Sequence, residues 1–433
     1  MIDAPITQDV EASAVRKVFQ HIALACAVIY VVAYIDRINV GFAALAMNQD
    51  LGLTNTAFGI ASTTLFLMYS AFEVPSMMLM RVMGTRRWLA RIMITWGLAS
   101  MGTIFAEGPY SLYALRALVG LAEAGLMPGL LFYLSQWFPI AHRARANSIY
   151  LASLPLSLVI GGPISGALLE MDGVMGLAGW RWLFLVEGAP AIILGFVVWR
   201  YLPNLPAEAK WLTDAEKQAL QSRLDQDNAA GPVSDGSAWK EIVRPQVILL
   251  ALAFFGVIAS ASMLGVWTPL IVKELVGGTR PLVIGSLTAI PPLVAVIFMQ
   301  WVSRRSDRRK ERIGHLIAVM ALATLGWATV VLAPSPALKM AGLSMSASGA
   351  YAGMAIFWAA ATQILGERNR ALGMAAIQSV AILASAVSPP IVGALRDATH
   401  NFYAGIWYAA ILLVVGIGLF AIAVRLKPAQ AVA

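Results

Sequence analysis

Apolar residues recur in long blocks along nearly the whole chain, and short polar segments separate the blocks. A helix needs about 20 predominantly apolar residues to cross the hydrocarbon core of a bilayer. Because helices satisfy their backbone hydrogen bonds internally in lipid, such blocks predict an all-α integral membrane protein. Twelve segments are long and apolar enough to be transmembrane helices: 18–44, 56–80, 88–106, 111–138, 145–169, 181–202, 245–272, 282–303, 313–333, 338–365, 371–395 and 402–425.

The longest polar stretch, residues 203–244, separates the first six predicted spans from the last six. It contains WLTDAEKQALQSRL, in which Thr213 and Glu216 have the spacing of a helix capping box. We therefore predict a short surface helix there, followed by a flexible segment, DQDNAAGPVSDGS. The chain is expected to divide into a bundle at 1–202, this linker, and a second bundle at 245–433.

An internal repeat supports two related halves. The segment GGPISGAL at 161–168 matches SPPIVGAL at 388–395 with an offset of 227 residues, and the same offset aligns Arg81 with Arg308. Repeats of this kind are typical of transporters whose two bundles rock about a site near the bilayer midplane. Chance similarity between helices rich in glycine and proline is the alternative interpretation.

Composition and charge agree with membrane embedding. Only 12% of the residues are charged, against about 25% in soluble domains. The predicted spans place the polar segments alternately on the two sides of a membrane. The side that holds the N-terminus carries 24 of the 31 lysines and arginines, and the opposite side carries five. The positive-inside rule then places both termini in the cytoplasm. The net charge of +8 is therefore a matter of topology, and no nucleic-acid site is expected.

Cysteine and histidine are too sparse to form several kinds of site. Cys26 is the only cysteine, so no intrachain disulfide is possible, and the four histidines lack the spacing of metal ligands. No nucleophile–base pair or phosphate-binding loop appears in the sequence. We therefore expect no enzyme, no metal and no cofactor. H⁺ as a coupling ion would require none of these sites.

Charged residues inside predicted spans mark the candidate site. Asp36 and Arg37 are adjacent in the first span, while Arg116 and Glu123 lie two turns apart on one face of the fourth. A charge at the bilayer centre costs roughly 2.5–3.5 kcal/mol on insertion scales, so such residues usually face a cavity. The aligned positions of the second half are uncharged: Met263, Leu264, Leu343 and Ala350. We expect anion and proton chemistry in the first half.

Two interpretations of these four charges remain open. In the structural one, two acids and two bases form neutral pairs that only fix the packing. In the functional one, Asp36 and Arg37 face a water-filled cavity, where an arginine fork binds an anion beside protonatable carboxylates. The bound anion would weaken the ion pair between the arginine and a carboxylate. Protonation of that carboxylate is then favoured. For Glu73 and Glu187, two further acids within spans, a structural role is preferred.

Several stretches together resemble the anion:cation symporter branch of the major facilitator superfamily: YIDRINVGFAAL, LRALVGLAEAGLMPG, QWFPIAHRARAN, GWRWLFLVEGAPA and WLTDAEKQAL. The resemblance covers almost the whole chain. It implies twelve transmembrane helices in two pseudo-symmetric six-helix bundles that alternate access. It also implies proton-coupled uptake of organic anions such as tartrate, sugar acids, phthalate and hydroxyphenylacetate, by a monomer in a bacterial inner membrane.

The resemblance also implies roles for individual residues. Asp36 and Glu123 match the proton-carrying acids of the branch, and Arg37 matches its arginine for the substrate carboxylate. The substrate-binding residues implied are Arg37, Arg116, Tyr69, Phe357, Trp358 and Gln378. The loop SRRSDRRKER keeps the gating motif Asp307–Arg308, but the aligned loop LMRVMGTRRW has Arg81 near the position where an acid is common.

Departures from the branch bear on the substrate. Ile382 stands where a second cavity asparagine is common, and the stretch FWAAATQILGERNRA lacks the usual proline. These changes favour an aromatic or less hydroxylated acid over a sugar acid. Two alternatives keep the fold: an anion exchanger or facilitator without proton coupling, and a sensor that binds its ligand without moving it.

Overall fold

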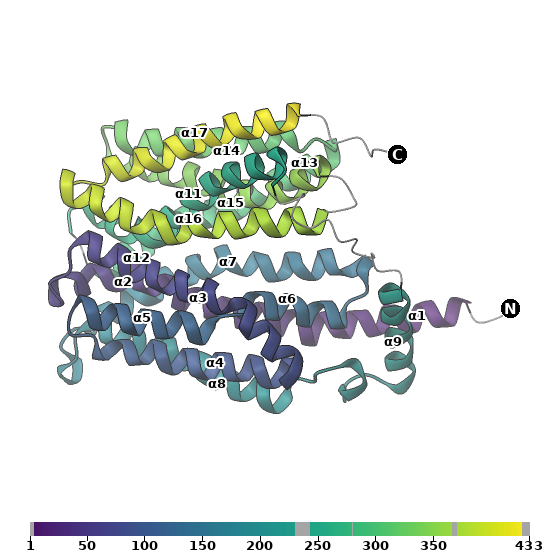
Figure 1. Cartoon of the computed structure of the whole chain (residues 1–433). Coiled ribbons are helices and arrows are strands. Elements are labelled where there is room, and N and C mark those ends of the chain that lie inside the picture. The colour runs from purple at the N-terminus through teal and green to yellow at the C-terminus, as the bar shows by residue number, and fades with distance from the viewer. Residues whose placement is uncertain (1–3, 230–242, 279, 366–369, 427–433) are drawn as a thin grey trace.

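The computed structural model describes residues 4–229, 243–278, 280–365 and 370–426, and most of them are helical (Figure 1). One bundle is formed by the helices α2 to α8. The helices of this N-terminal half are α1 (Ala4–Val18), the π-helical turn η1 (Phe19–Ala23), α2 (Leu24–Asp50), α3 (Asn55–Met83), α4 (Thr85–Gly102), η2 (Thr103–Phe105), α5 (Pro109–Glu123), α6 (Leu126–Trp137), α7 (Ile140–Leu169), η3 (Val174–Gly176) and α8 (Gly179–Tyr201).

The second bundle contains the helices from α11 onward, and η4 (Pro206–Glu208) and α9 (Asp214–Ala229) come before it in the chain. Its helices are α11 (Pro245–Leu275), α12 (Pro281–Thr288), α13 (Ile290–Arg309), α14 (Ile313–Leu332), α15 (Pro336–Ile364), α16 (Arg370–Thr399) and α17 (Tyr403–Arg425). The two bundles lie side by side, and α1, α9 and the C-terminal end of α17 share one end of the molecule (Figure 1). We call this the linker end and the opposite end the far end.

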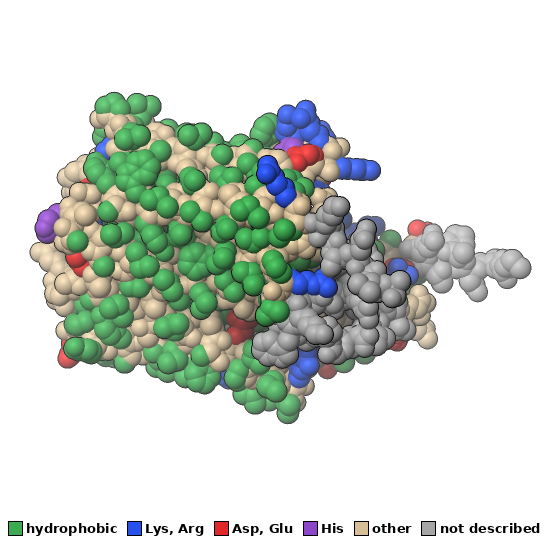
Figure 2. Space-filling model, turned by 45° about the horizontal axis from the view of Figure 1, so that its top comes forward, with side chains coloured by type: hydrophobic (Ala, Val, Ile, Leu, Met, Phe, Trp, Pro, Cys, Tyr) green, Lys and Arg blue, Asp and Glu red, His purple; other side chains and the backbone are tan. Residues whose placement is uncertain are grey.

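Every one of the twelve predicted spans corresponds to helix in the structure, which confirms the all-α membrane fold. Ten helical segments in the described residues are long and apolar enough to cross a membrane. The other two spans are α7, whose apolar part is Ser153–Leu169, and α15. α15 is rich in glycine, alanine and serine, and these small residues are buried against neighbouring helices, where high hydropathy is not needed. Figure 2 shows hydrophobic side chains over the middle of the visible face and lysine and arginine mainly toward the linker end.

Two predicted spans are interrupted, which the hydrophobic pattern did not indicate. The segment 111–138 divides into α5 and α6, because Ala124 is extended and Gly125 has a left-handed φ of 85°. A Cβ on Gly125 would lie 2.4 Å from the Ser76 Oγ, so the break requires glycine. The Ser76 hydroxyl donates a hydrogen bond to the freed Ala124 carbonyl at 2.6 Å. The segment 282–303 divides more mildly into α12 and α13, because Ala289 between them keeps right-handed helical dihedrals, with φ −75° and ψ −18°.

The linker helix α9 is docked against α1. The predicted capping box is confirmed: the Thr213 amide donates to Glu216 at 2.8 Å, and the Glu216 amide donates to the Thr213 hydroxyl at 3.3 Å. The Glu216 carboxylate also accepts hydrogen bonds from Lys17 and Ser13, both at 2.8 Å. The helix continues to Ala229, so the start of the predicted flexible segment is helical, and the remainder lies outside the described residues.

Replacing Glu216 with glutamine is expected to release α9 from α1. Burial would raise the pKa of Glu216, but hydrogen bonds from Lys17, the Thr213 amide and Ser13 lower it from 4.5 to about 2. The stabilisation is therefore complete above pH 4.5 and is lost as the pH falls toward 2. Each hydrogen bond to a charged group contributes about 1.5–3 kcal/mol. Limited proteolysis of the linker should be faster in Glu216→Gln, with Glu11→Gln as control.

The two bundles meet at the far end. The Asp397 carboxylate, at the end of α16, accepts four hydrogen bonds of 2.6–3.0 Å from the amides and side chains of Asn55 and Thr56, at the start of α3. Arg280 pairs with Glu170 at 2.8 Å across the same gap. These contacts tie α3 and α7 of the first bundle to α16 and the start of α12 in the second, so the structure has a closed far end.

Candidate functional site

The centre of the candidate site is an ion pair between two helices of the N-terminal bundle. Arg37 Nη2, from α2, lies 2.6 Å from the Glu123 Oε1, from α5. The Glu123 side chain is 2% exposed and the Arg37 side chain 15% exposed, so the arginine is the more accessible member of the pair. Glu123 is the last residue of α5, because the helix breaks at the next two residues. A discontinuous helix at a central site is typical of secondary transporters.

Tyrosines surround this pair. The Tyr69 ring, on α3, lies 4.8 Å from the Arg37 Cζ, a cation–π distance. Tyr30 packs against Tyr150 from α7, with ring centroids 4.3 Å apart. In the described part of the chain the Tyr69 and Tyr150 hydroxyls and Arg37 Nε have no hydrogen-bond partner. Buried donors that lack partners are costly, so this arrangement suits an anion that accepts from them.

Sequence analysis missed Tyr30, Tyr34 and Tyr150. The pattern contained a signal for two of them: Tyr30, Tyr34 and Arg37 have i, i+4, i+7 spacing and therefore share one face of α2. Tyr34 also lies close enough to Tyr351 of α15 for the two side chains to interact electrostatically. Tyr351 therefore places one side chain of the second bundle near this group.

Asp36 points away from Arg37, into the N-terminal bundle. It is 2% exposed and accepts hydrogen bonds from Trp96 Nε1 at 2.6 Å, from Asn39 Nδ2 at 3.0 Å and from the Ser100 hydroxyl. All three donors belong to α2 and α4. The expectation that Asp36 faces a cavity between the bundles is therefore wrong, because the 100° step between adjacent helical residues turns it inward.

Arg116 is also buried, close to the two acids. It is 2% exposed, and it interacts electrostatically with both Asp36 and Glu123. Its Nε and Nη1 have no hydrogen-bond partner in the described residues. The four predicted charges thus form one cluster of two acids and two bases, whose formal charges cancel.

The predicted residues of the second bundle are only partly near this cluster. Phe357 is fully buried and stacks on Phe254 of α11, with centroids 4.1 Å apart, so it is a core residue of its own bundle. Trp358 is half-buried against the same Phe254 at 5.1 Å. Gln378 is exposed on α16. The structure therefore brings Arg37, Tyr69, Glu123, Asp36 and Arg116 together but does not bring Phe357 to them.

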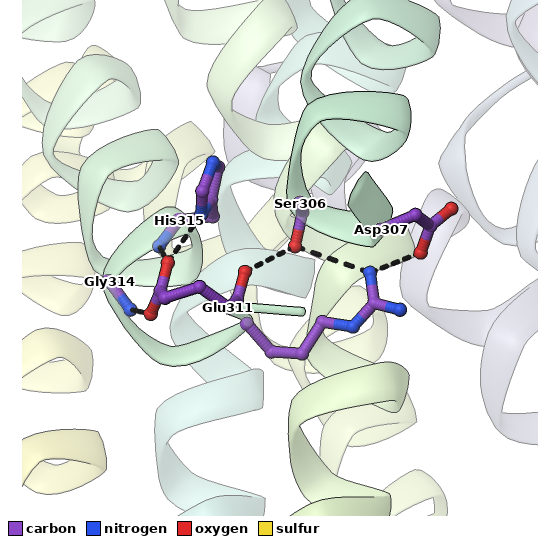
Figure 3. Close-up of polar contacts among 6 residues, drawn as sticks. Ser306, Asp307, Glu311, Gly314 and His315 are labelled. Carbon is purple, nitrogen blue, oxygen red and sulfur yellow. Dashed lines mark hydrogen bonds and ion pairs between the residues drawn. The ribbon is translucent and has the colours of Figure 1, made fainter. Parts of the chain in front are cut away.

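Asp307, one of the three predicted gating residues, joins a polar network at the junction of α13 and α14 (Figure 3). Asp307 forms an ion pair with Arg312, and Arg312 donates to the Ser306 hydroxyl at 3.3 Å. Glu311 caps α14 by accepting from the Gly314 and His315 amides. Burial raises the pKa of Glu311, but these hydrogen bonds outweigh it and lower the pKa. Asp307 and Arg308 therefore lie in the last turn of α13, so most of the predicted loop SRRSDRRKER is helical. Asp307 pairs with the residue before α14, while Arg308 and Arg81 are exposed.

Two bundles of transmembrane helices, the first of which holds a buried and electroneutral charged cluster, are typical of a membrane transporter. The sequence agrees: the model of the Major Facilitator Superfamily matches residues 26–364. The chain belongs to this family. The match covers most of both bundles, and it agrees with the twelve-helix fold.

Similar proteins fall in the same class. The chain is 40% identical over 426 residues to a protein of Agrobacterium vitis named "Putative tartrate transporter", covering 98% of this chain and 94% of that protein. It is 36% identical over 410 residues to a "Quinolone resistance transporter" of Acinetobacter baumannii, covering 94% of each. Among solved structures, an inward-facing bacterial homolog to the human lysosomal transporter Spinster shares the fold, with a TM-score of 0.78 at 17% identity, covering 94% of this chain and 97% of that chain.

Proposed function

We propose that this protein is a secondary active transporter that couples proton entry to the uptake of a small organic carboxylate by alternating access. The Arg37–Glu123 pair, 2.6 Å apart beside tyrosine hydroxyls without partners, is the observation that carries this proposal. The arginine fork suits a carboxylate, and the tyrosines supply further donors. The linker end is then the cytoplasmic face of a bacterial plasma membrane, and the protein works as a monomer without cofactor.

Charge balance explains why the anion and the proton move together. A substrate carboxylate that binds Arg37 competes with Glu123 for the guanidinium, and Glu123 then becomes neutral by taking a proton. The empty cluster is electroneutral, and so is the cluster that holds one anion and one proton. A cluster that holds only one of them carries a net charge, which is costly to enclose in a low-dielectric interior. The half-loaded carrier therefore changes conformation slowly.

The lining and the names of two relatives support the proposed substrate class. Tyrosines offer aromatic faces and hydroxyl groups around the arginine: Tyr30, Tyr34, Tyr69 and Tyr150. Tyr351 of the second bundle interacts with Tyr34. Such a lining suits an aromatic acid or a hydroxy acid, and the name of the Agrobacterium vitis relative points to a hydroxy-dicarboxylate. Because the Acinetobacter baumannii relative is named a quinolone resistance transporter, a quinolone should also be tested as a substrate.

Proteoliposomes that contain a pH dye test the proposal. We expect proton influx when one class of acid is added outside, from a panel of aromatic acids, hydroxy-dicarboxylates, sugar acids and a quinolone. Glu123→Gln should abolish acid-driven proton influx, while Glu107→Gln, at the exposed far end, should leave it unchanged. Uptake of a labelled acid without proton movement would overturn symport in favour of an exchanger or facilitator. Binding without any uptake would identify a sensor.

A further inference from the structure

A second buried acid, Glu187 of α8, lies inside the N-terminal bundle and has no part in the substrate site. It is 5% exposed, and its Oε1 accepts a hydrogen bond from the Ser165 hydroxyl of α7 at 2.7 Å. Its Oε2 has no hydrogen-bond partner, and no lysine or arginine forms an ion pair with it in the described residues. A buried carboxylate without a cation and with a free oxygen is strongly disfavoured, whereas a protonated one can donate from that oxygen.

The charged groups near Glu187 do not supply a counter-charge. From α2, Asp36 interacts with it electrostatically and has the same sign when ionised. On α4, close approaches place Gly97 beside Gly188 and Ala90 beside Gly195, so Arg91 lies about two turns toward the linker end. On α7 the contacting group is the neutral Ser165, while the basic residues of that helix are at its start. The environment therefore favours the neutral acid.

Asn39 connects the two acids. Its Nδ2 donates to Asp36 Oδ1 at 3.0 Å, and its Oδ1 has no hydrogen-bond partner. Its side chain also lies close enough to Glu187 to interact with that carboxyl group, although no hydrogen bond of normal geometry joins them. An amide has a donor end and an acceptor end. If its donor end serves an ionised Asp36, its acceptor end is available to a protonated Glu187.

We infer that Glu187 holds a proton in this conformation, with the Asn39 carbonyl group as its acceptor, beside an ionised Asp36. Asp36 accepts three hydrogen bonds, which fits its ionised form. The N-terminal bundle contains a proton store that is separate from Glu123, and this inference extends the proposed proton coupling.

Infrared spectroscopy of the purified full-length protein tests this store without any substrate. We expect a C=O stretching band of a protonated carboxylic acid at neutral pH, and Glu187→Gln should remove it. Asn39→Leu should keep the band but move it to higher frequency, because the acid loses its acceptor. The exposed Glu107→Gln is the matched control and should leave the band unchanged. A band that persists in Glu187→Gln would overturn the inference.

A second measurement separates this inference from the proposed function. In proteoliposomes, Glu187→Gln should retain uptake but shift the pH at half-maximal uptake, by about one unit or tenfold in proton concentration, because Asp36 loses its coupled partner. An unchanged pH profile would also overturn the inference. If the infrared band behaves as expected but the wild type moves acid without protons, the proton store stands and the proposal of symport fails.

Discussion

Replacing Arg37 with lysine is expected to lower acid uptake by about 100-fold or more while leaving the protein folded. The guanidinium contacts Glu123 at 2.6 Å and Tyr69 at 4.8 Å, and its Nε has no partner. A lysine keeps the charge but loses the planar fork, so it cannot bind Glu123 and a substrate carboxylate together. Each charge-assisted hydrogen bond that the ammonium group cannot make to the substrate costs about 1.5–3 kcal/mol, which is the source of the expected loss of uptake.

Uptake of labelled acid and the melting temperature should be measured on the same preparations. Arg181→Lys is the matched control, because this arginine stacks near Trp180 at 5.1 Å and lies at the far end, outside the cluster. The double variant Arg37→Gln with Glu123→Gln removes both charges at once. It should recover thermal stability relative to Arg37→Gln alone, but it should not transport. If Arg37→Lys takes up acid at the wild-type rate, the Arg37–Glu123 pair has a purely structural role.

The sequence was sufficient to predict the twelve spans, the surface helix and the four charged residues of the cluster. Hydrophobic blocks are a strong signal because lipid allows few alternatives to a helix. The helix break after Glu123 was not predicted, because it depends on the close approach of Ser76 to Gly125 from another helix. Contacts of this kind are set by packing between distant segments rather than by local pattern.

The sequence also did not predict the direction in which each side chain of the site points. Asp36 and Arg37 are equally polar neighbours, and only the positions of Trp96 and Ser100 decide which of them points into the bundle. Phe357 matched a family pattern, yet it stacks in the core of the second bundle. The family pattern identifies a position but does not state whether its side chain serves packing or binding.

The contact between α3 and α16 keeps the far end closed, and replacing a residue within it should have a large effect on access from that end. A Cβ on Gly393 would lie 2.3 Å from the Asn55 carbonyl oxygen, and one on Gly59 would lie 2.5 Å from the Pro389 carbonyl oxygen. Backbone therefore touches backbone across the two bundles, next to the hydrogen bonds of Asp397. Any side chain at Gly393 forces the helices apart at the far end, whereas the linker end is not involved.

Gly393→Ala is accordingly expected to favour a conformation that is open at the far end. Overpacking of this kind costs about 1–3 kcal/mol, which corresponds to a shift of roughly 10- to 100-fold between the two conformations. A cysteine at Thr63, whose hydroxyl bonds to the Ala386 carbonyl in the closed state, serves as the reporter. The native Cys26 is buried and should give little background. Labelling by an impermeant maleimide, added outside intact cells, should rise at least tenfold.

The control for this variant is Gly418→Ala on α17, where an added Cβ meets no atom within 4 Å. It should leave labelling unchanged, which separates the effect of contact between the bundles from that of losing a helical glycine. Asp397→Asn should raise labelling in the same direction as Gly393→Ala, because it weakens the hydrogen bonds to Asn55 and Thr56 without adding bulk. If labelling rises in Gly418→Ala as well, or in neither Gly393→Ala nor Asp397→Asn, then the α3–α16 contact does not control access from the far end. The closed far end would in that case depend on the remaining pairs, of which Arg280 with Glu170 is the next to replace.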